Sequence, residues 1–178
     1  MDFYQSVGFL ILGSRMRRLS DYMLSEINKV YQEADLEFEA RWFPLFYVLD
    51  QEKEISIRDL STRIQLSHSA VSQLVSHLKK RGLMSSHTDA ADGRKQLITL
   101  TRDGERLLVK IKPIWSSMIQ AIEEITYEDR DMATLLKGLT AAEEGFARTS
   151  LSKRMQELLI AQNNCQAVEH PLNQAIIE

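Results

Sequence analysis

Residues 56–104 have the sequence SIRDLSTRIQLSHSAVSQLVSHLKKRGLMSSHTDAADGRKQLITLTRDG, and their pattern of caps and apolar residues indicates the fold class. Its first half predicts two short helices joined by a tight turn. Ser56 and Asp59 form a capping box, which starts the first helix. Ser67 can cap the second helix in the same way. Gly82 then supplies the left-handed residue that commonly ends a helix.

The second helix has two different faces. Its apolar positions recur every three or four residues, as expected for a stripe that faces a core, and they are Val71, Leu74, Val75 and Leu78. The opposite face contains Ser69, Ser72, Gln73, Ser76 and Lys80. No Asp or Glu occurs in residues 60–86. Hydroxyls, an amide and a cation can bind base edges and phosphates, so this face is typical of a helix that contacts DNA.

After the second helix, the apolar period changes from three or four residues to two. Residues 83–88 and 95–100 predict two strands, and the Asp-Gly turn chemistry of residues 89–94 joins them into a hairpin. Thr101 can cap the helix that follows. Two helices joined by a turn and followed by a basic-tipped hairpin predict a winged helix-turn-helix.

Apolar patterning also extends to both sides of this region. Residues 3–31 have apolar side chains every three or four positions, which predicts one long helix, and residues 42–49 predict a short buried helix. After the hairpin, a helix should run from Thr101 to a stop near Thr126, with a kink at Pro113. A capping box at Thr126 should start another helix.

The 178-residue chain has a net charge of −3, which is unevenly distributed. Residues 51–112 contain twelve Lys or Arg and seven Asp or Glu, a net of +5, and the other residues have a net charge of −8. A basic middle between acidic flanks is typical of a localised surface that binds a polyanion. Chance clustering on a solvated face explains the charge alone equally well.

Composition argues against several other classes of protein. A single cysteine, Cys165, excludes a disulfide framework and a zinc site built on cysteine pairs, and a free thiol without a sensing role is expected there. The four histidines lack the spacing of metal ligands, and no catalytic or cofactor-binding motif is present. We therefore expect no metal, no cofactor and no enzymatic activity. The acidic N-terminus and the lack of a long apolar run predict a soluble, cytoplasmic protein.

The motifs of this region resemble the MarR family of transcriptional regulators. The resemblance is carried by LS at 66–67, VSQLV at 71–75, LKKRGL at 78–83, DAADGRK at 89–95 and LTRDG at 100–104. It covers residues 3–146. It implies a homodimer whose N- and C-terminal helices interlock, and whose two recognition helices bind a pseudo-palindromic DNA operator.

The sequence departs from the family pattern at the wing and on the recognition helix. Ala90 and Gly93 stand where the family commonly has a proline and the first of two arginines, which leaves Arg94 backed by Lys95. Arg94 is therefore the strongest candidate for a contact between the wing and DNA. Gln73 stands where the family often has arginine, and it suits adenine rather than guanine.

These considerations predict which residues contact DNA. Base edges should be contacted by Ser69, Ser72 and Gln73. Phosphates or the neighbouring minor groove should be contacted by Ser56, Ser67, His77, Lys79, Lys80, Arg94 and Lys95. His68 is either a DNA contact or a solvated polar residue. Asp89 or Asp92 should orient Arg94, or else pair with it for structural reasons alone.

The resemblance also implies an effector pocket between the dimer helices and the winged lobe. Residues of the types that line a site for an aromatic or lipophilic anion are Arg17, Trp42, Phe43, Phe46 and Tyr47. Core packing explains each of them equally well.

The expected architecture is mainly α (α+β). It comprises a winged-helix domain at 1–155 with a DNA-binding lobe at 51–101 and dimerisation helices at 3–31 and 102–150, and a weakly patterned C-terminal tail at 156–178. The runs FYQ at 3–5, LGSR at 12–15 and KPIW at 112–115 further resemble MarR-type regulators that are fused to a GNAT acetyltransferase. The residues after 150 are too few for that enzyme, and no Gly-x-Gly pair is present, so we expect the regulator without it.

The predicted function is sequence-specific DNA binding by a homodimeric transcriptional regulator. We expect a repressor more than an activator, released from DNA by a small lipophilic or aromatic ligand. The alternative is a winged-helix adaptor that binds proteins and has lost DNA binding. The acid-free face of the second helix favours DNA.

Overall fold

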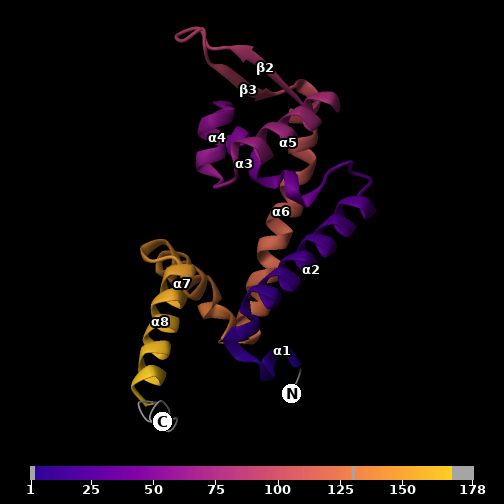
Figure 1. The fold of residues 1–178 in the computed structure, drawn as a ribbon. Coiled ribbons are helices and arrows are strands. Elements are labelled where there is room, and N and C mark those ends of the chain that lie inside the picture. The colour runs from indigo at the N-terminus through magenta and orange to yellow at the C-terminus, as the bar shows by residue number, and fades with distance from the viewer. Residues whose placement is uncertain (1–2, 130, 170–178) are drawn as a thin grey trace, which may run out of the picture. The chain divides into compact units, whose positions relative to one another are not determined.

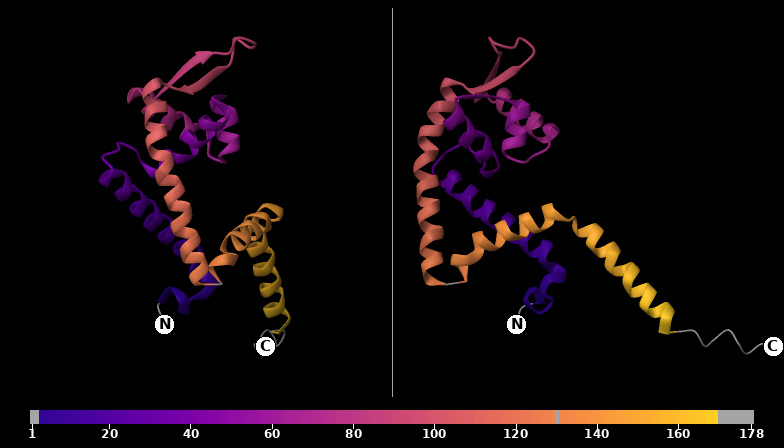
Figure 2. Two further views of the ribbon diagram at one scale, coloured as in Figure 1. Left: turned by 180° about the vertical axis from the view of Figure 1, so that it is seen from behind. Right: turned by 90° about the vertical axis from the view of Figure 1, so that its left-hand side faces the viewer.

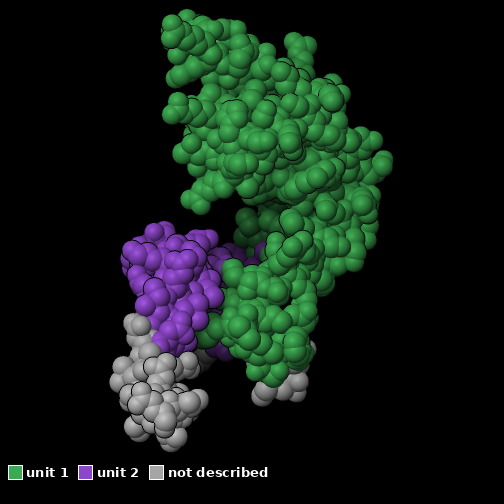
Figure 3. Space-filling model, viewed as in Figure 1, with its two compact units in different colours: residues 1–121 green, residues 122–178 purple. Residues whose placement is uncertain are grey.

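The computed structural model describes residues 3–129 and 131–169. The chain divides into two compact units, residues 1–121 and 122–178 (Figure 3). The last residues of the expected C-terminal tail, 170–178, lie outside the described residues.

Helices dominate both units. The first unit contains, in order, α1 (Phe3–Ser6), the 3-10 helix η1 (Gly8–Ile11), α2 (Leu12–Glu33), the 3-10 helix η2 (Ala40–Trp42), α3 (Phe43–Glu52), β1 (Glu54–Ser56), α4 (Ile57–Arg63), α5 (His68–Lys80), β2 (Met84–Thr88), β3 (Gln96–Leu100) and most of α6 (Arg102–Glu128). The second unit contains the end of α6, the 3-10 helix η3 (Met132–Thr134), α7 (Leu135–Arg148) and α8 (Leu151–Glu169). The class is mainly α, with a winged helix as predicted.

A winged-helix lobe is formed by α3, α4, α5 and a small antiparallel sheet (Figure 1). The strand order is β1-β3-β2, and Ile98 in the central strand pairs with Ile55 of β1 and Ser86 of β2. The predicted hairpin is confirmed as β2 and β3, whose loop projects beyond the helices (Figure 2). Strand β1 was not predicted, because three residues are too few to show an alternating pattern.

The core of the first unit joins the lobe to the long helices. Its fully buried side chains include Tyr31, Trp42, Leu45, Phe46, Leu60, Val71, Leu78, Ile98 and Ile111. Phe38 makes edge-to-face contacts with Tyr31, Trp42 and Phe46, at ring-centroid distances of 4.8–5.5 Å. These contacts hold α3 against the end of α2.

Helix α5, the wing and α6 meet at one corner. Gly82 has φ of +72° and ends α5, as predicted. Thr101 stands at the start of α6: its hydroxyl donates to the Gly82 carbonyl at 2.6 Å and accepts from the Gly104 backbone N–H at 3.1 Å. The Thr101 N–H donates to the Leu83 carbonyl at 3.1 Å. A Cβ at Gly104 would overlap that same carbonyl, so only glycine lets α6 approach so closely.

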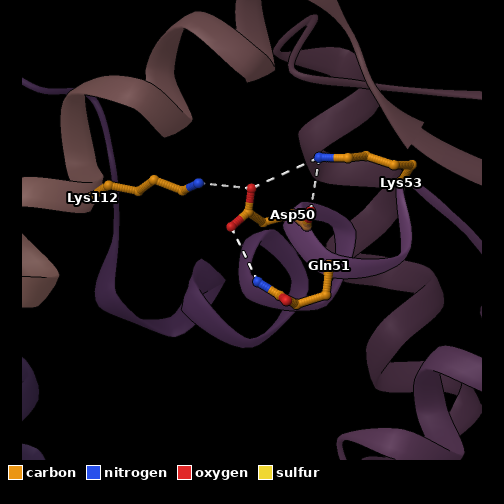
Figure 4. Close-up of polar contacts among 4 residues, drawn as sticks. All are labelled: Asp50, Gln51, Lys53 and Lys112. Carbon is orange, nitrogen blue, oxygen red and sulfur yellow. Dashed lines mark hydrogen bonds and ion pairs between the residues drawn. The ribbon is translucent and has the colours of Figure 1, made fainter.

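Polar contacts fix α6 against α2 and α3. The buried indole N–H of Trp115 donates to the Tyr31 hydroxyl at 2.9 Å. Burial raises the pKa of the Tyr31 phenol, and the hydrogen bond from Trp115 lowers it by less. The Asp50 carboxylate, which is 14% exposed, accepts from Lys112 Nζ at 2.8 Å, and Lys53 Nζ lies 4.0 Å from the same oxygen (Figure 4).

Several predicted helix boundaries were wrong. The single helix expected over 3–31 is broken at Gly8, whose φ of +63° ends α1 before η1. Helix α6 continues past Thr126, whose hydroxyl donates to the Ile122 carbonyl within the helix instead of capping a new one. The next turn is held by Asp129, whose carboxylate accepts from the Asp131 N–H at 2.7 Å. The segment expected as a weakly patterned tail contributes most of α8, whose apolar residues are not confined to one face.

We predict that Gly104→Ala destabilises the fold by about 1–3 kcal/mol, because the added methyl must displace the backbone at Leu83. Gly13→Ala is the matched control, since Gly13 lies in α2 with no atom near its Cβ position. The control should be neutral or more stable by about 0.5–1 kcal/mol. Urea unfolding followed by circular dichroism measures both, and equal stability of the two variants would contradict the corner's role.

Candidate nucleic-acid interface

Helix α5 presents one face to the core and the other to solvent. Its first turn is capped by Ser67, whose hydroxyl accepts from the Ala70 N–H at 3.2 Å. Val71, Val75 and Leu78 are 0–2% exposed and anchor the helix on the core. Because this apolar stripe fixes the rotation of the helix, the polar face must point outward.

The outward face has the composition that the sequence predicted. Of the candidate base contacts, Ser69 and Gln73 are exposed and Ser72 is half-buried. Ser76 and Lys80 are exposed on the same helix, and His68 is exposed at its first position. Because α5 has no carboxylate, nothing on the helix itself would repel a phosphate.

The C-terminal end of α5 is packed against its surroundings. Lys79 Nζ donates to the Ser86 hydroxyl of β2 at 2.6 Å, and the His77 ring lies 5.7 Å from that of Trp42. Arg81 contacts the face of the Trp42 ring and pairs with Glu37 at 2.6 Å. Two expected phosphate contacts, His77 and Lys79, thus have partners within the protein.

Sequence reasoning did not single out Arg81. Its partner Glu37 is 44 residues away, and no local pattern could have indicated the pairing. The pair joins the end of α5 to the segment before η2. The indole Nε1 of Trp42, beneath Arg81, is buried and has no hydrogen-bond partner among the described residues.

The loop of the wing is built by its two aspartates. The Asp89 carboxylate accepts from the Ala91 N–H at 2.8 Å, and the Asp92 carboxylate accepts from the Arg94 backbone N–H at 3.1 Å. Both aspartates therefore hold the backbone of the turn. The side chains of Arg94 and Lys95 are exposed, and neither forms an ion pair within the described part of the chain.

Ser56 has a capping role and little exposure. Its hydroxyl donates to the Asp59 carboxylate at 2.7 Å and accepts from the Asp59 N–H at 3.1 Å. Ser56 therefore caps α4 as predicted, and the Asp59 carboxylate accepts the Ser56 hydroxyl instead of the backbone N–H that a full capping box would use. With 8% exposure and its proton given to Asp59, Ser56 is not a free donor for a phosphate.

The candidate effector residues are placed in different surroundings. Trp42 and Phe46 are fully buried in the core. Phe43 is half-buried and packs edge-to-face on Trp115 at 4.8 Å, with the 49%-exposed Tyr47 beside it. The remaining candidate is cationic: Arg17, an exposed residue of α2 that lies 3.8 Å from Asp21.

Metal binding and membrane spanning were the two other features sought in the described residues. In residues 3–129 and 131–169, no group of three or more His, Cys, Asp or Glu side chains is arranged to hold a metal ion. Within the same ranges, no helix has the length and hydropathy needed to cross a membrane.

A model of the MarR family matches residues 35–95, which include α3 to α5 and most of the wing. These residues form a MarR-family domain. SarZ, an HTH-type transcriptional regulator of Staphylococcus haemolyticus, is 29% identical over 91 residues. That match covers 51% of this chain and 56% of SarZ, so the chain spans only about half of this curated relative.

Solved structures extend the likeness beyond this MarR-family domain. The PcaV transcriptional regulator of Streptomyces coelicolor is 26% identical and has a TM-score of 0.62. The superposition covers 75% of this chain and 97% of PcaV. A MarR variant of E. coli in complex with operator DNA has the same TM-score at 15% identity and covers 80% of this chain and 98% of that one. The second likeness shows the fold alone.

Proposed function

We propose that the protein is a sequence-specific DNA-binding transcriptional regulator. The observation that carries the proposal is the exposed, acid-free face of α5 beside a wing whose Arg94 has no ion-pair partner among the described residues. SarZ and PcaV are both transcriptional regulators, which supports the same function for this chain.

Groove dimensions explain how this surface would bind. The major groove, about 12 Å wide, admits an α-helix, so α5 would place Ser69, Ser72 and Gln73 against base edges. The wing would then reach the adjacent minor groove, whose negative potential attracts an arginine such as Arg94. Ser67, Lys80 and Lys95 would hold the backbone between these contacts.

The proposal includes a homodimer that binds a pseudo-palindromic operator. Between residues 40 and 101, only Tyr47 and Leu66 are large apolar side chains that are exposed. Helix α2 alone exposes six: Met16, Leu19, Tyr22, Met23, Leu24 and Val30. Apolar surface concentrated in this way is typical of a subunit interface.

We further propose that the regulator is a repressor that a small lipophilic or aromatic ligand releases from DNA. Tyr47 and Phe43 lie where α3 meets α6, beside Trp115. A ligand that contacts these rings would change the packing of α6 against the lobe.

Selection of random double-stranded DNA by the purified full-length protein tests the function. We expect an inverted repeat with half-sites about one helical turn apart, and a dimeric mass by light scattering. If a folded preparation enriched no sequence, even at low salt, the adaptor function would be favoured instead.

The roles of two residues of α5 can be separated on the selected duplex. Gln73→Ala should lose about 1–3 kcal/mol of discrimination at one base pair per half-site, because a base-edge contact is removed. Lys80→Ala should weaken all sequences alike and make the slope of log affinity against log salt less steep by about 0.9 per subunit. Fluorescence anisotropy across a salt series measures both effects. If both variants lowered the affinity for every DNA sequence by the same factor, the assigned roles would be wrong.

A further inference from the structure

We propose that a cleft between α4 and the start of β3 binds a phosphate of the DNA backbone, with Arg58 as its principal cation. The inference rests on the proposed function and assigns a contact to a residue that sequence reasoning did not select. Its ligand is the phosphodiester of the operator.

The cleft lies beside the loop of the wing, where β3 begins. It has a volume of about 600 Å³, and its lining includes Ser56, Arg58, Asp59, His68, Arg94 and Lys95. The lining residues come from three places: the end of β1 with α4, the first position of α5, and the wing, where Arg94 and Lys95 lie in the loop and Gln96 begins β3. A group bound there would contact all three parts at once.

The charge of the cleft favours an anion. Three lining side chains are cations, Arg58, Arg94 and Lys95, and all three are exposed. The single carboxylate, Asp59, already accepts the Ser56 hydroxyl. No ion pair involves any of the three cations within residues 3–129 and 131–169, so none of them must give up a partner to bind a phosphate.

A second arginine on the same helix already has an acidic partner. Arg63, five residues after Arg58 on α4, pairs with Glu52. Both arginines are exposed, and both are carried by the same short helix. Arg58 is therefore free to bind an anion where Arg63 is already neutralised, and Arg63 provides the matched control.

The location identifies the anion as the DNA backbone. If α5 enters the major groove and the wing enters the neighbouring minor groove, the sugar–phosphate strand that separates the two grooves must pass between them. The lining of the cleft includes both His68 of α5 and Arg94 of the wing, so the cleft adjoins the two elements between which that strand would pass. An arginine suits this position, because its guanidinium can bind two phosphate oxygens together.

The test compares full-length Arg58→Ala and Arg63→Ala with the wild type on the selected duplex. We expect Arg58→Ala to keep the selected sequence but to make the salt slope less steep by about 1.8, since a dimer loses two phosphate contacts of about 0.9 each. Arg63→Ala should leave the slope unchanged. Thermal unfolding of both variants verifies that each is folded.

Single methylphosphonate substitutions then locate the contact. Removing the charge of the phosphate between the two grooves should weaken the wild type and Arg63→Ala, but not Arg58→Ala. Equal effects on all three proteins, or equal losses of slope in both variants, would overturn the proposal. The proposal would also fail if inorganic phosphate, added at constant ionic strength, abolished the difference in DNA affinity between the wild type and Arg58→Ala. The cleft would then bind a free anion. If the wild type bound no DNA, the proposed function itself would fail, and this contact with it.

Discussion

The hydrogen bonds of Thr101 at the Gly82–Leu83 corner determine how α5, the wing and α6 are placed relative to one another. One residue joins the end of the recognition helix to the start of α6, and Gly104 lets the two backbones come into contact. The wing begins and ends at this corner, because Leu83 precedes β2 and Thr101 follows β3. The direction of the wing relative to α5 is therefore set by backbone contacts and not by flexible side chains.

The same rigidity extends from the lobe into the long helices. Trp115 on α6 is tied to Tyr31 on α2 by a buried hydrogen bond, and Lys112 on α6 is tied to Asp50 at the end of α3. The bond between Trp115 and Tyr31 is buried and therefore costly to leave unmade, so α6 and α2 move together more readily than apart. In a dimer formed through α2 and its neighbours, such coupling would transmit the spacing of the two subunits to their recognition helices. That spacing would select the distance between operator half-sites.

Features that depend on residues close together in the sequence could be predicted from the sequence. The caps at Ser56 and Ser67 and the turn at Gly82 depend on residues within a few positions, so the helices that carry the interface were predicted from the sequence. Features that join residues far apart in the sequence could not be predicted in this way. Strand β1 exists only because β3 pairs with it, and the cleft at Arg58 exists only because residues of the wing lie beside α4. The buried state of Trp42 and the partners of Lys79 likewise depend on tertiary packing.

On the operator, the wing should reach the minor groove while α5 occupies the major groove. An iron chelate attached at Gly93→Cys, in a Cys165→Ser background so that the thiol is unique, tests this most directly. The same chelate at Gly138→Cys, on α7, is the control. We expect cleavage on both strands at the outer end of each half-site, with the 3′-offset pattern typical of the minor groove. Absence of cleavage at these positions in a complex that still binds the operator, or a pattern centred in the major groove, would contradict it.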